Sequence, residues 1–297
     1  MAISEDQLDT WAAQGAIATS SNTYQSIRNA LLASGTAYAG KDVDVFLQGS
    51  YGNDTNVYAE SDVDVVIRLD DTIYTDLSDL SADDRALYDA NRTAATYSYD
   101  TFKADVIKAL KAAFGDAFVK EGPKAVWIKP SGNRRSADVI VSTEYRRYHR
   151  FRSWQDQRYD SGICFWSGYT QIINYPKQHS TNCTAKHQAT NRWFKPTVRI
   201  LKNMRNRMVS AGLIDKKIAP SYYLEGLLYN VPNDKFGTSY QDTFVNTYNW
   251  IINADSTEFV CANEQYYLLR DGNEVTWPVA SGDAFLKQLA QYWKDWQ

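Results

Sequence analysis

Residues Leu47 to Leu69 read LQGSYGNDTNVYAESDVDVVIRL, and this stretch decides the fold. A glycine–serine pair, Gly49-Ser50, follows one apolar run, and the aspartates Asp62 and Asp64 stand at the head of a second. Side chains two residues apart on a strand point to the same face, about 7 Å apart. The two carboxylates are therefore predicted to share a metal site. The Gly-Ser turn upstream can offer backbone N–H groups to a phosphate.

A third carboxylate, Asp138, interrupts the apolar segment Ala137–Val141. A charge within a buried strand is costly without a partner, so Asp138 is predicted to join Asp62 and Asp64. Mg²⁺ prefers oxygen ligands and is often held by carboxylates together with substrate phosphates. Two such ions activate a hydroxyl and stabilise leaving pyrophosphate. The pattern therefore indicates metal-dependent phosphoryl transfer, with Asp138 on the nucleophile side and helping to deprotonate the hydroxyl.

The bulk composition narrows the class of partner. The chain has 297 residues and a net charge of -3. Proteins that follow a long nucleic-acid backbone usually carry a basic excess, so a small nucleotide is favoured over a long duplex. The three cysteines are too few for a disulfide framework. The polar N-terminus is no secretory signal, and no apolar run reaches membrane-spanning length. A cytoplasmic location without membrane contact is expected.

Apolar periodicity predicts a change of architecture along the chain. Strands are expected at residues 44–48, 62–69, 125–129 and 136–142, and helices at 20–39 and 99–118. That order predicts a mixed sheet with helices on one side. Later helices are expected at residues 190–209, 221–230, 241–254 and 281–296. The predicted domains are a catalytic lobe at residues 1–180 and a helical lobe at residues 181–297.

The pattern Q-G-S-Y-G-N-D-T-N-x-x-x-x-S-D-V-D-V resembles the signature of the DNA polymerase β-like nucleotidyltransferases. Within that superfamily the chain is similar to the bacterial cGAS/DncV-like nucleotidyltransferases (CD-NTases). The similarity continues through Asp138, the segment FKPTVRILK at residues 194–202 and PSYYLE at residues 220–225. The resemblance implies an α+β fold: a polymerase β-like lobe with a mixed sheet, a C-terminal helical lobe, and an active site in the cleft between them.

The same resemblance implies a cyclic oligonucleotide synthase. Such an enzyme joins nucleoside triphosphates without a template into a cyclic di- or trinucleotide and releases pyrophosphate. It uses two Mg²⁺ ions, with Mn²⁺ as the alternative, and its product is a second messenger in anti-phage (CBASS) signalling, sensed by an effector protein. A monomer without an obligatory long nucleic acid is expected. Two alternatives stay open: nucleotide addition to RNA or to a small acceptor, and a non-catalytic nucleotide-binding module.

Several further residues are candidates for nucleotide binding. Gly49 and Ser50 would donate backbone N–H groups, and Ser50 a hydroxyl, to the β- and γ-phosphates of the donor nucleotide. The resemblance implies that Lys202 and Ser221 contact the triphosphate. Arg199 has two interpretations of equal weight: it supports that phosphate site, or it pairs with Glu225 in the interior.

The tyrosines of the same region divide into two predictions. Tyr222 is the candidate for stacking on a base, because every base offers a π-face. Tyr223 is expected in the core. Asn53 and Thr55 flank the Gly-Ser turn and are expected to shape it rather than to contact substrate.

Two weaker clusters have competing interpretations. His179, Cys183 and His187 recur every four residues, which would fit a zinc site on one helix face. The intervening residues 180–182 do not favour a helix, and no fourth ligand is evident, so a loop before a helix is preferred. The basic run of residues 146–152 is interpreted as a solvated edge, with an acceptor-nucleotide or RNA surface as the alternative.

Overall fold

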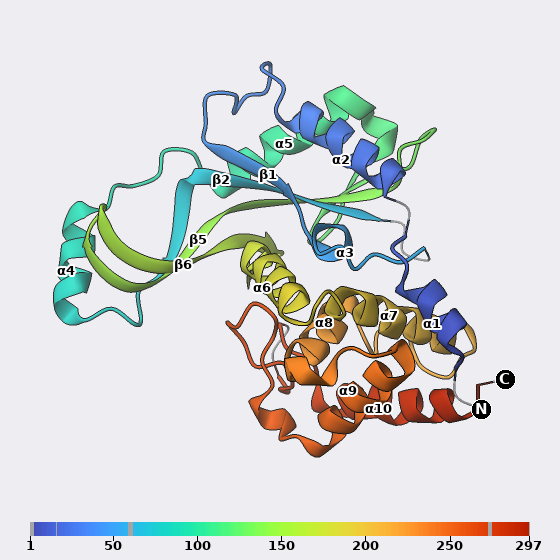
Figure 1. Ribbon diagram of the computed structural model, residues 1–297. Helices are drawn as coiled ribbons and strands as arrows, with labels where there is room; N and C mark the ends of the chain where they lie inside the picture. The colour runs from blue at the N-terminus through green and yellow to red at the C-terminus, as the bar shows by residue number, and fades with distance from the viewer. Residues whose placement is uncertain (1–2, 16, 59–61, 273–274, 297) are drawn as a thin grey trace. The chain divides into compact units, whose positions relative to one another are not determined.

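The computed structural model describes residues 3–15, 17–58, 62–272 and 275–296 (Figure 1). Residues 59–61, which end the expected turn region and begin the motif S-D-V-D-V, lie outside this description. The chain forms two compact units, each made of separated segments. Unit 1 comprises residues 1–17, 49–61 and 177–297, and unit 2 comprises residues 18–48 and 62–176. Two early segments thus belong with the helical unit, while the division into lobes at residue 180 stays a prediction.

Unit 2 is built on one seven-stranded mixed sheet, as expected. Its central path is β1-β2-β5-β4-β3, and β6 and β7 extend from β5. Only β2 and β5 among these strands pair in parallel. The strands are β1 (Val43–Leu47), β2 (Val63–Asp76), β3 (Val119–Glu121), β4 (Val126–Ile128), β5 (Ala137–Ser153), β6 (Asp156–Ser167) and β7 (Thr170–Asn174).

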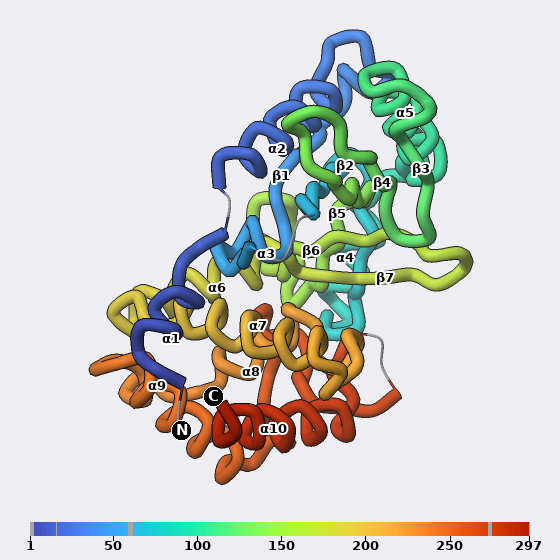
Figure 2. Tube along the Cα trace, turned by 90° about the vertical axis from the view of Figure 1, so that its right-hand side faces the viewer, coloured from blue at the N-terminus to red at the C-terminus, as the bar shows by residue number. Residues whose placement is uncertain are grey.

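Two helices of unit 2 pack against each other and against the sheet, α2 (Ala18–Leu31) and α5 (Tyr99–Phe114) (Figures 1 and 2). Their apolar positions at helical spacing, Ile27, Phe102 and Val106, are fully buried. A third helix, α4 (Ala82–Asn91), packs on the long strand β5, and a short 3₁₀ turn, η1 (Asp116–Phe118), follows α5. The helices therefore cover the sheet with the side chains that the periodicity predicted.

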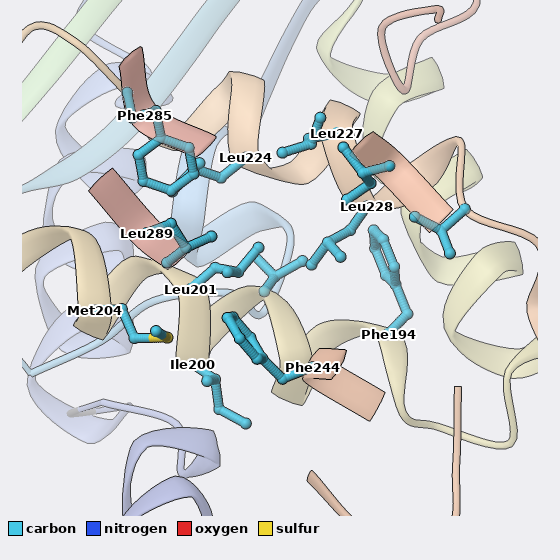
Figure 3. Close-up of a cluster of buried hydrophobic side chains, with 14 of the residues drawn as sticks. Phe194, Ile200, Leu201, Met204, Leu224, Leu227, Leu228, Phe244, Phe285 and Leu289 are labelled. Atoms are coloured by element: carbon cyan, nitrogen blue, oxygen red, sulfur yellow. The ribbon is translucent and has the colours of Figure 1, made fainter. Parts of the chain in front are cut away.

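Unit 1 is helical and centres on α7 (Phe194–Ser210), which contacts α1, α8, α9 and α10. Its other helices are α1 (Glu5–Ala12), α3 (Gly49–Gly52), α6 (Pro176–Ala189), α8 (Ser221–Tyr229), α9 (Tyr240–Asn253) and α10 (Val279–Lys294), with 3₁₀ turns η2 (Asn233–Lys235) and η3 (Ser256–Glu258). Figure 3 shows the buried apolar cluster, in which Phe194 and Leu201 of α7 lie among leucines of α8 and α10.

Helix α3 lies in the predicted Gly-Ser turn, no element was predicted at α4, and α6 begins where a loop was expected. The sequence favoured a loop after Pro176, but α6 runs without interruption from Pro176 to Ala189. Proline is tolerated in a first helical turn because its missing N–H has no partner there in any case. The polar residues 180–182 are helical because tertiary contacts override weak propensity. None of the helices in the described ranges is long and apolar enough to cross a membrane.

Candidate active site

The three predicted aspartates come together on the sheet of unit 2. Asp64 is the second residue of β2, and Asp62 immediately precedes that strand. The parallel pairing of β2 with β5 sets Asp64 in register with Asp138. Residues in register, and residues two apart on one strand, face the same side of a sheet. The structure therefore assembles all three carboxylates on one face.

The environment of these carboxylates favours a cation. Asp62 is exposed and accepts a hydrogen bond from the Ser136 hydroxyl. Asp138 is half-buried, and burial, with the charge of Asp62, raises the pKa of its carboxyl above the usual 3.8. Ionising the group is thus costly where no positive charge is near. An all-oxygen donor set of this kind fits a hard divalent ion such as Mg²⁺.

The Gly-Ser pair begins where β1 ends. The backbone N–H of Gln48 donates to the Asp64 carbonyl at 3.0 Å, so the last residue before the pair lies beside an active-site strand. Gly49 has φ 61°, a left-handed conformation that costs glycine nothing. Ser50 then accepts at its carbonyl from the Thr55 N–H at 2.9 Å. The predicted turn is thus the single-turn helix α3, and the backbone that follows it is hydrogen-bonded to Gly49 and Ser50.

Residues 52–56, which follow this turn and are here called the post-turn segment, are anchored by buried polar side chains of unit 1. Asn53 Nδ2 donates to Glu225 Oε2 at 2.9 Å, and the Thr55 hydroxyl donates to Glu225 Oε1. Ser180 donates to the Gly52 carbonyl at 3.0 Å. Asn53 and Thr55 are both buried, so they shape the backbone after the turn, as expected.

The basic face of α7 points at the same segment. Lys195 pairs with the Asp54 carboxylate at 3.0 Å, and Arg199 donates to the Asp54 carbonyl at 2.7 Å. Lys202 is fully buried and donates to the Thr55 carbonyl at 2.9 Å. These cations at positions i, i+4 and i+7 lie on one face of the helix. The assignment of Lys202 and Arg199 to the triphosphate stays a prediction.

The proposed pairing of Arg199 with Glu225 is wrong. Arg199 donates to the carbonyls of Ala12 and Asp54, whereas Glu225 forms a hydrogen bond with His179, whose Nε2 lies 2.6 Å from Oε2. No local pattern indicates this pair, because 46 residues separate its members. Only the packing of α6 on α8 brings them together.

The residues at the start of α8 have distinct environments. Ser221 accepts a hydrogen bond from Arg205 at 3.2 Å, a contact that sequence reasoning missed. Tyr222 stacks on His179 with ring centroids 4.9 Å apart. Tyr223 stacks on Trp277 at 5.6 Å, and its hydroxyl bonds to a backbone carbonyl. Tyr223 is thus a core residue, as predicted, while the roles of Ser221 and Tyr222 toward nucleotide stay predictions.

The candidate zinc residues divide differently from the expected trio. Ligand atoms of His179, Cys183 and Glu225 lie within 4.8 Å of one another, and all three residues are buried. His187 is not part of that group. Burial raises the pKa of the Cys183 thiol well above its usual value, and the charge of Glu225 adds to this. Without a metal the thiol is therefore protonated at neutral pH, and a metal ion would have to displace that proton to bind the thiolate.

The basic run on β5 is neutralised by acidic neighbours rather than presented as a bare surface. Each of its members has a carboxylate partner: Arg146–Glu144, Arg147–Asp79, His149–Asp160, Arg150–Asp156 and Arg152–Asp84. A nucleic-acid backbone is bound through cations that it can neutralise. These pairs favour the interpretation as a solvated edge.

Comparison with known proteins assigns the chain to a family. Residues 181–294 match the model of the cGAS/DncV-like nucleotidyltransferase C-terminal helical domain. The cyclic UMP-AMP synthase of Rhodothermus marinus is 37% identical over 100% of this chain and 99% of its own length. The cyclic nucleotide synthase CdnE01 of Staphylococcus haemolyticus is also 37% identical, over 100% of both chains.

Solved structures agree with that assignment. The Rhodothermus marinus CdnE c-UMP-AMP synthase, solved with Apcpp and Upnpp, superposes with a TM-score of 0.89 at 36% identity, covering 99% of this chain and 97% of the other. The Elizabethkingia meningoseptica CdnE cyclic dinucleotide synthase, solved with GTP and Apcpp, gives 0.76 at 31% identity, covering 98% of each. The α+β fold with its mixed sheet and helical C-terminal part is that of these enzymes, and the chain belongs to the cGAS/DncV-like nucleotidyltransferases.

Proposed function

We propose that this protein joins nucleoside triphosphates into a cyclic dinucleotide or trinucleotide and releases pyrophosphate at each step. The observation that carries the proposal is the register of Asp64 with Asp138 and the placement of Asp62 on the same face. Full-length relatives at 37% identity carry the names of cyclic nucleotide synthases. The fold, the carboxylates and the relatives all support nucleotidyl transfer.

The reaction consists of two successive displacements. In each, a ribose hydroxyl oxygen forms a bond to an α-phosphorus, and the bond between that phosphorus and pyrophosphate breaks. The first displacement gives a linear intermediate with a triphosphate end, and the second closes the ring. The protein contributes mainly by positioning the groups and neutralising charge.

We assign the roles within the site as follows. Asp62, Asp64 and Asp138 would hold two divalent ions, Mg²⁺ or Mn²⁺. When bound, such ions neutralise phosphate charge and stabilise the leaving pyrophosphate. Asp138 accepts the proton of the attacking hydroxyl, a role that its raised pKa favours. Gly49 and Ser50 would bind the β- and γ-phosphates of the donor.

The remaining nucleotide contacts are proposed from the family resemblance. Lys202 and Ser221 would act on the triphosphate, with Arg199 supporting them, and Tyr222 would stack on a base. Relatives are named for UMP-AMP, dipurine and dipyrimidine products, so all four nucleotides are candidate substrates here. The product would act as an anti-phage messenger for a separate effector protein, and the synthase would be a cytoplasmic monomer.

Product analysis tests this function. Purified protein is incubated with all four nucleoside triphosphates and Mg²⁺, treated with phosphatase, and analysed by mass spectrometry. We expect a phosphatase-resistant cyclic product. The double variant Asp62→Asn, Asp64→Asn should form none while keeping its circular dichroism spectrum. Labelled tails on added RNA would instead support the first alternative. Nucleotide binding without turnover would support the non-catalytic module.

A further inference from the structure

The post-turn segment is fixed by a buried polar network that centres on Glu225. The Glu225 carboxylate accepts hydrogen bonds from both Asn53 and Thr55, and it pairs with His179. Glu225 itself is only 2% exposed. A carboxylate is rarely this deeply buried unless several partners satisfy it. The segment and the helices that hold it belong to one compact unit.

The charge of Glu225 is stabilised rather than suppressed. Burial raises the pKa of its carboxyl, but the hydrogen bond and charge of His179, with the charge of Lys202, outweigh burial and leave the pKa below its usual 4.5. Glu225 is therefore ionised at neutral pH. An ionised acceptor makes stronger hydrogen bonds than a neutral one, which favours a single position for Asn53 and Thr55.

A second set of contacts, from α7, also holds the segment. Asp54 has φ 55°, a conformation uncommon outside glycine, asparagine and aspartate. Lys195 and Arg199 bind its carboxylate and carbonyl, and Lys202 binds the next carbonyl. Aspartate is one of the few residues other than glycine that adopts this conformation readily. Lys195, Arg199 and Lys202, all buried or half-buried, thus bind Asp54 and Thr55 within this short segment.

We propose that Glu225 is a positioning residue for nucleotide binding: through Asn53 and Thr55 it sets the backbone that closes the Gly49-Ser50 turn. This rests on the proposed function of Gly49 and Ser50 as phosphate ligands. Thr55 is the direct link, because its N–H bonds to the Ser50 carbonyl while its hydroxyl bonds to Glu225. Loss of the network therefore weakens nucleotide binding more than it slows chemistry.

The test compares two isosteric threonine variants. Thr55→Val removes the hydroxyl that reaches Glu225. Thr247→Val is the matched control, because Thr247 is also buried in unit 1 but its hydroxyl bonds only within α9. The four nucleotides are varied together at saturating Mg²⁺, and pyrophosphate release is followed. We expect Thr55→Val and Glu225→Gln to raise the apparent KM about tenfold, the loss of one charge-assisted hydrogen bond, with kcat changed less than about threefold. Thr247→Val should leave KM unchanged.

Combining the variants separates positioning from general stability. Because Thr55 acts through Glu225, the double variant should have the KM of Glu225→Gln alone rather than the product of both effects. An unchanged KM in folded Thr55→Val, or equal effects of Thr55→Val and Thr247→Val, would overturn the proposal. So would one equivalent of zinc bound to the purified wild type and lost in Cys183→Ser, since Glu225 would then be a metal ligand.

Failure of the proposed function would be visible separately. If the wild type forms no cyclic product, that function fails, and the dissociation constant for ATP, measured by calorimetry, replaces KM. The positioning role of Glu225 is then supported by a tenfold weaker binding in Thr55→Val and overturned by equal binding.

Discussion

The two units stabilise carboxylates in opposite ways. In unit 2, Asp62, Asp64 and Asp138 share one face, and the pKa of Asp138 is raised by burial and by its acidic neighbour. In unit 1, Glu225 is more deeply buried, yet its pKa is lowered by His179 and Lys202. The first arrangement stores repulsion that a bound cation relieves, and the second satisfies its charge internally. We therefore expect ion binding at the three aspartates, whose negative charges share one face, and a rigid local structure around Glu225, whose charge is neutralised by its neighbours.

The largest effect on product formation should come from substitutions at the three aspartates. Asp64→Asn removes one predicted metal ligand, so we expect product formation to fall by on the order of 10³-fold or more. The melting temperature should not fall, because like-charge repulsion is reduced. Mass spectrometry of the product and differential scanning fluorimetry measure the two quantities. A variant that retains a tenth of the activity would contradict the assignment.

The network around Glu225 should respond in stability as well as in nucleotide binding. Lys202→Met keeps the length of the side chain but leaves the buried Thr55 carbonyl without this donor. We expect the free energy of unfolding to fall by about 1–3 kcal/mol. Urea denaturation measures it. Equal stability of variant and wild type would show that the buried lysine is not part of a stabilising network.

The pH dependence should distinguish the two kinds of carboxylate. A raised pKa means that the folded state binds the Asp138 proton more tightly, so this group favours folding below its unfolded pKa of 3.8 and loses that contribution as pH rises through the raised value. Asp138→Asn should therefore raise the melting temperature at pH 7, and the difference from wild type should vanish toward pH 3. A lower melting temperature at pH 7 would contradict this.

The smallest effect is expected on the paired basic run. Arg150 and Asp156 form an exposed pair, with side chains 53% and 50% exposed. Such pairs contribute about 0–1 kcal/mol. Arg150→Ala should therefore change the free energy of unfolding by less than about 1 kcal/mol and leave product formation unchanged. A large loss of activity would point to an acceptor surface on β5 after all.

The catalytic face could be predicted from sequence because its signals are local. Asp62 and Asp64 are two residues apart at the start of a predicted strand, and Asp138 interrupts an apolar one. The neighbouring residues alone therefore predict where each aspartate lies. The starts of β1, β2, β4 and β5 were expected within one residue for the same reason, although β2 and β5 continue past their predicted ends to Asp76 and Ser153. The predicted helix at residues 20–39 ends earlier, at Leu31, since the residues that follow lack the helical pattern of buried side chains.

The buried network could not be predicted, because its signals lie far apart in the chain. Glu225 reaches residues more than 150 positions away, Asn53 and Thr55. The spacing of Lys195, Arg199 and Lys202 indicated a basic face but not what it contacts. A cationic stripe on a helix is usually solvated, and only packing shows that this one faces inward. The unexpected start of α6 has the same origin, as His179 becomes part of the network.

The composite make-up of unit 1 has a consequence for protein engineering. The region that the family model recognises, residues 181–294, is only part of a compact unit that also contains two earlier segments of the chain. Glu5 caps α9 through the N–H groups of Tyr240 and Gln241, and Glu225 depends on residues near position 54. A chimera that exchanges only the C-terminal region between relatives would place the buried Glu225 carboxylate next to residues of the other protein in place of Asn53 and Thr55. Exchanges that preserve folding would have to carry three stretches of chain together.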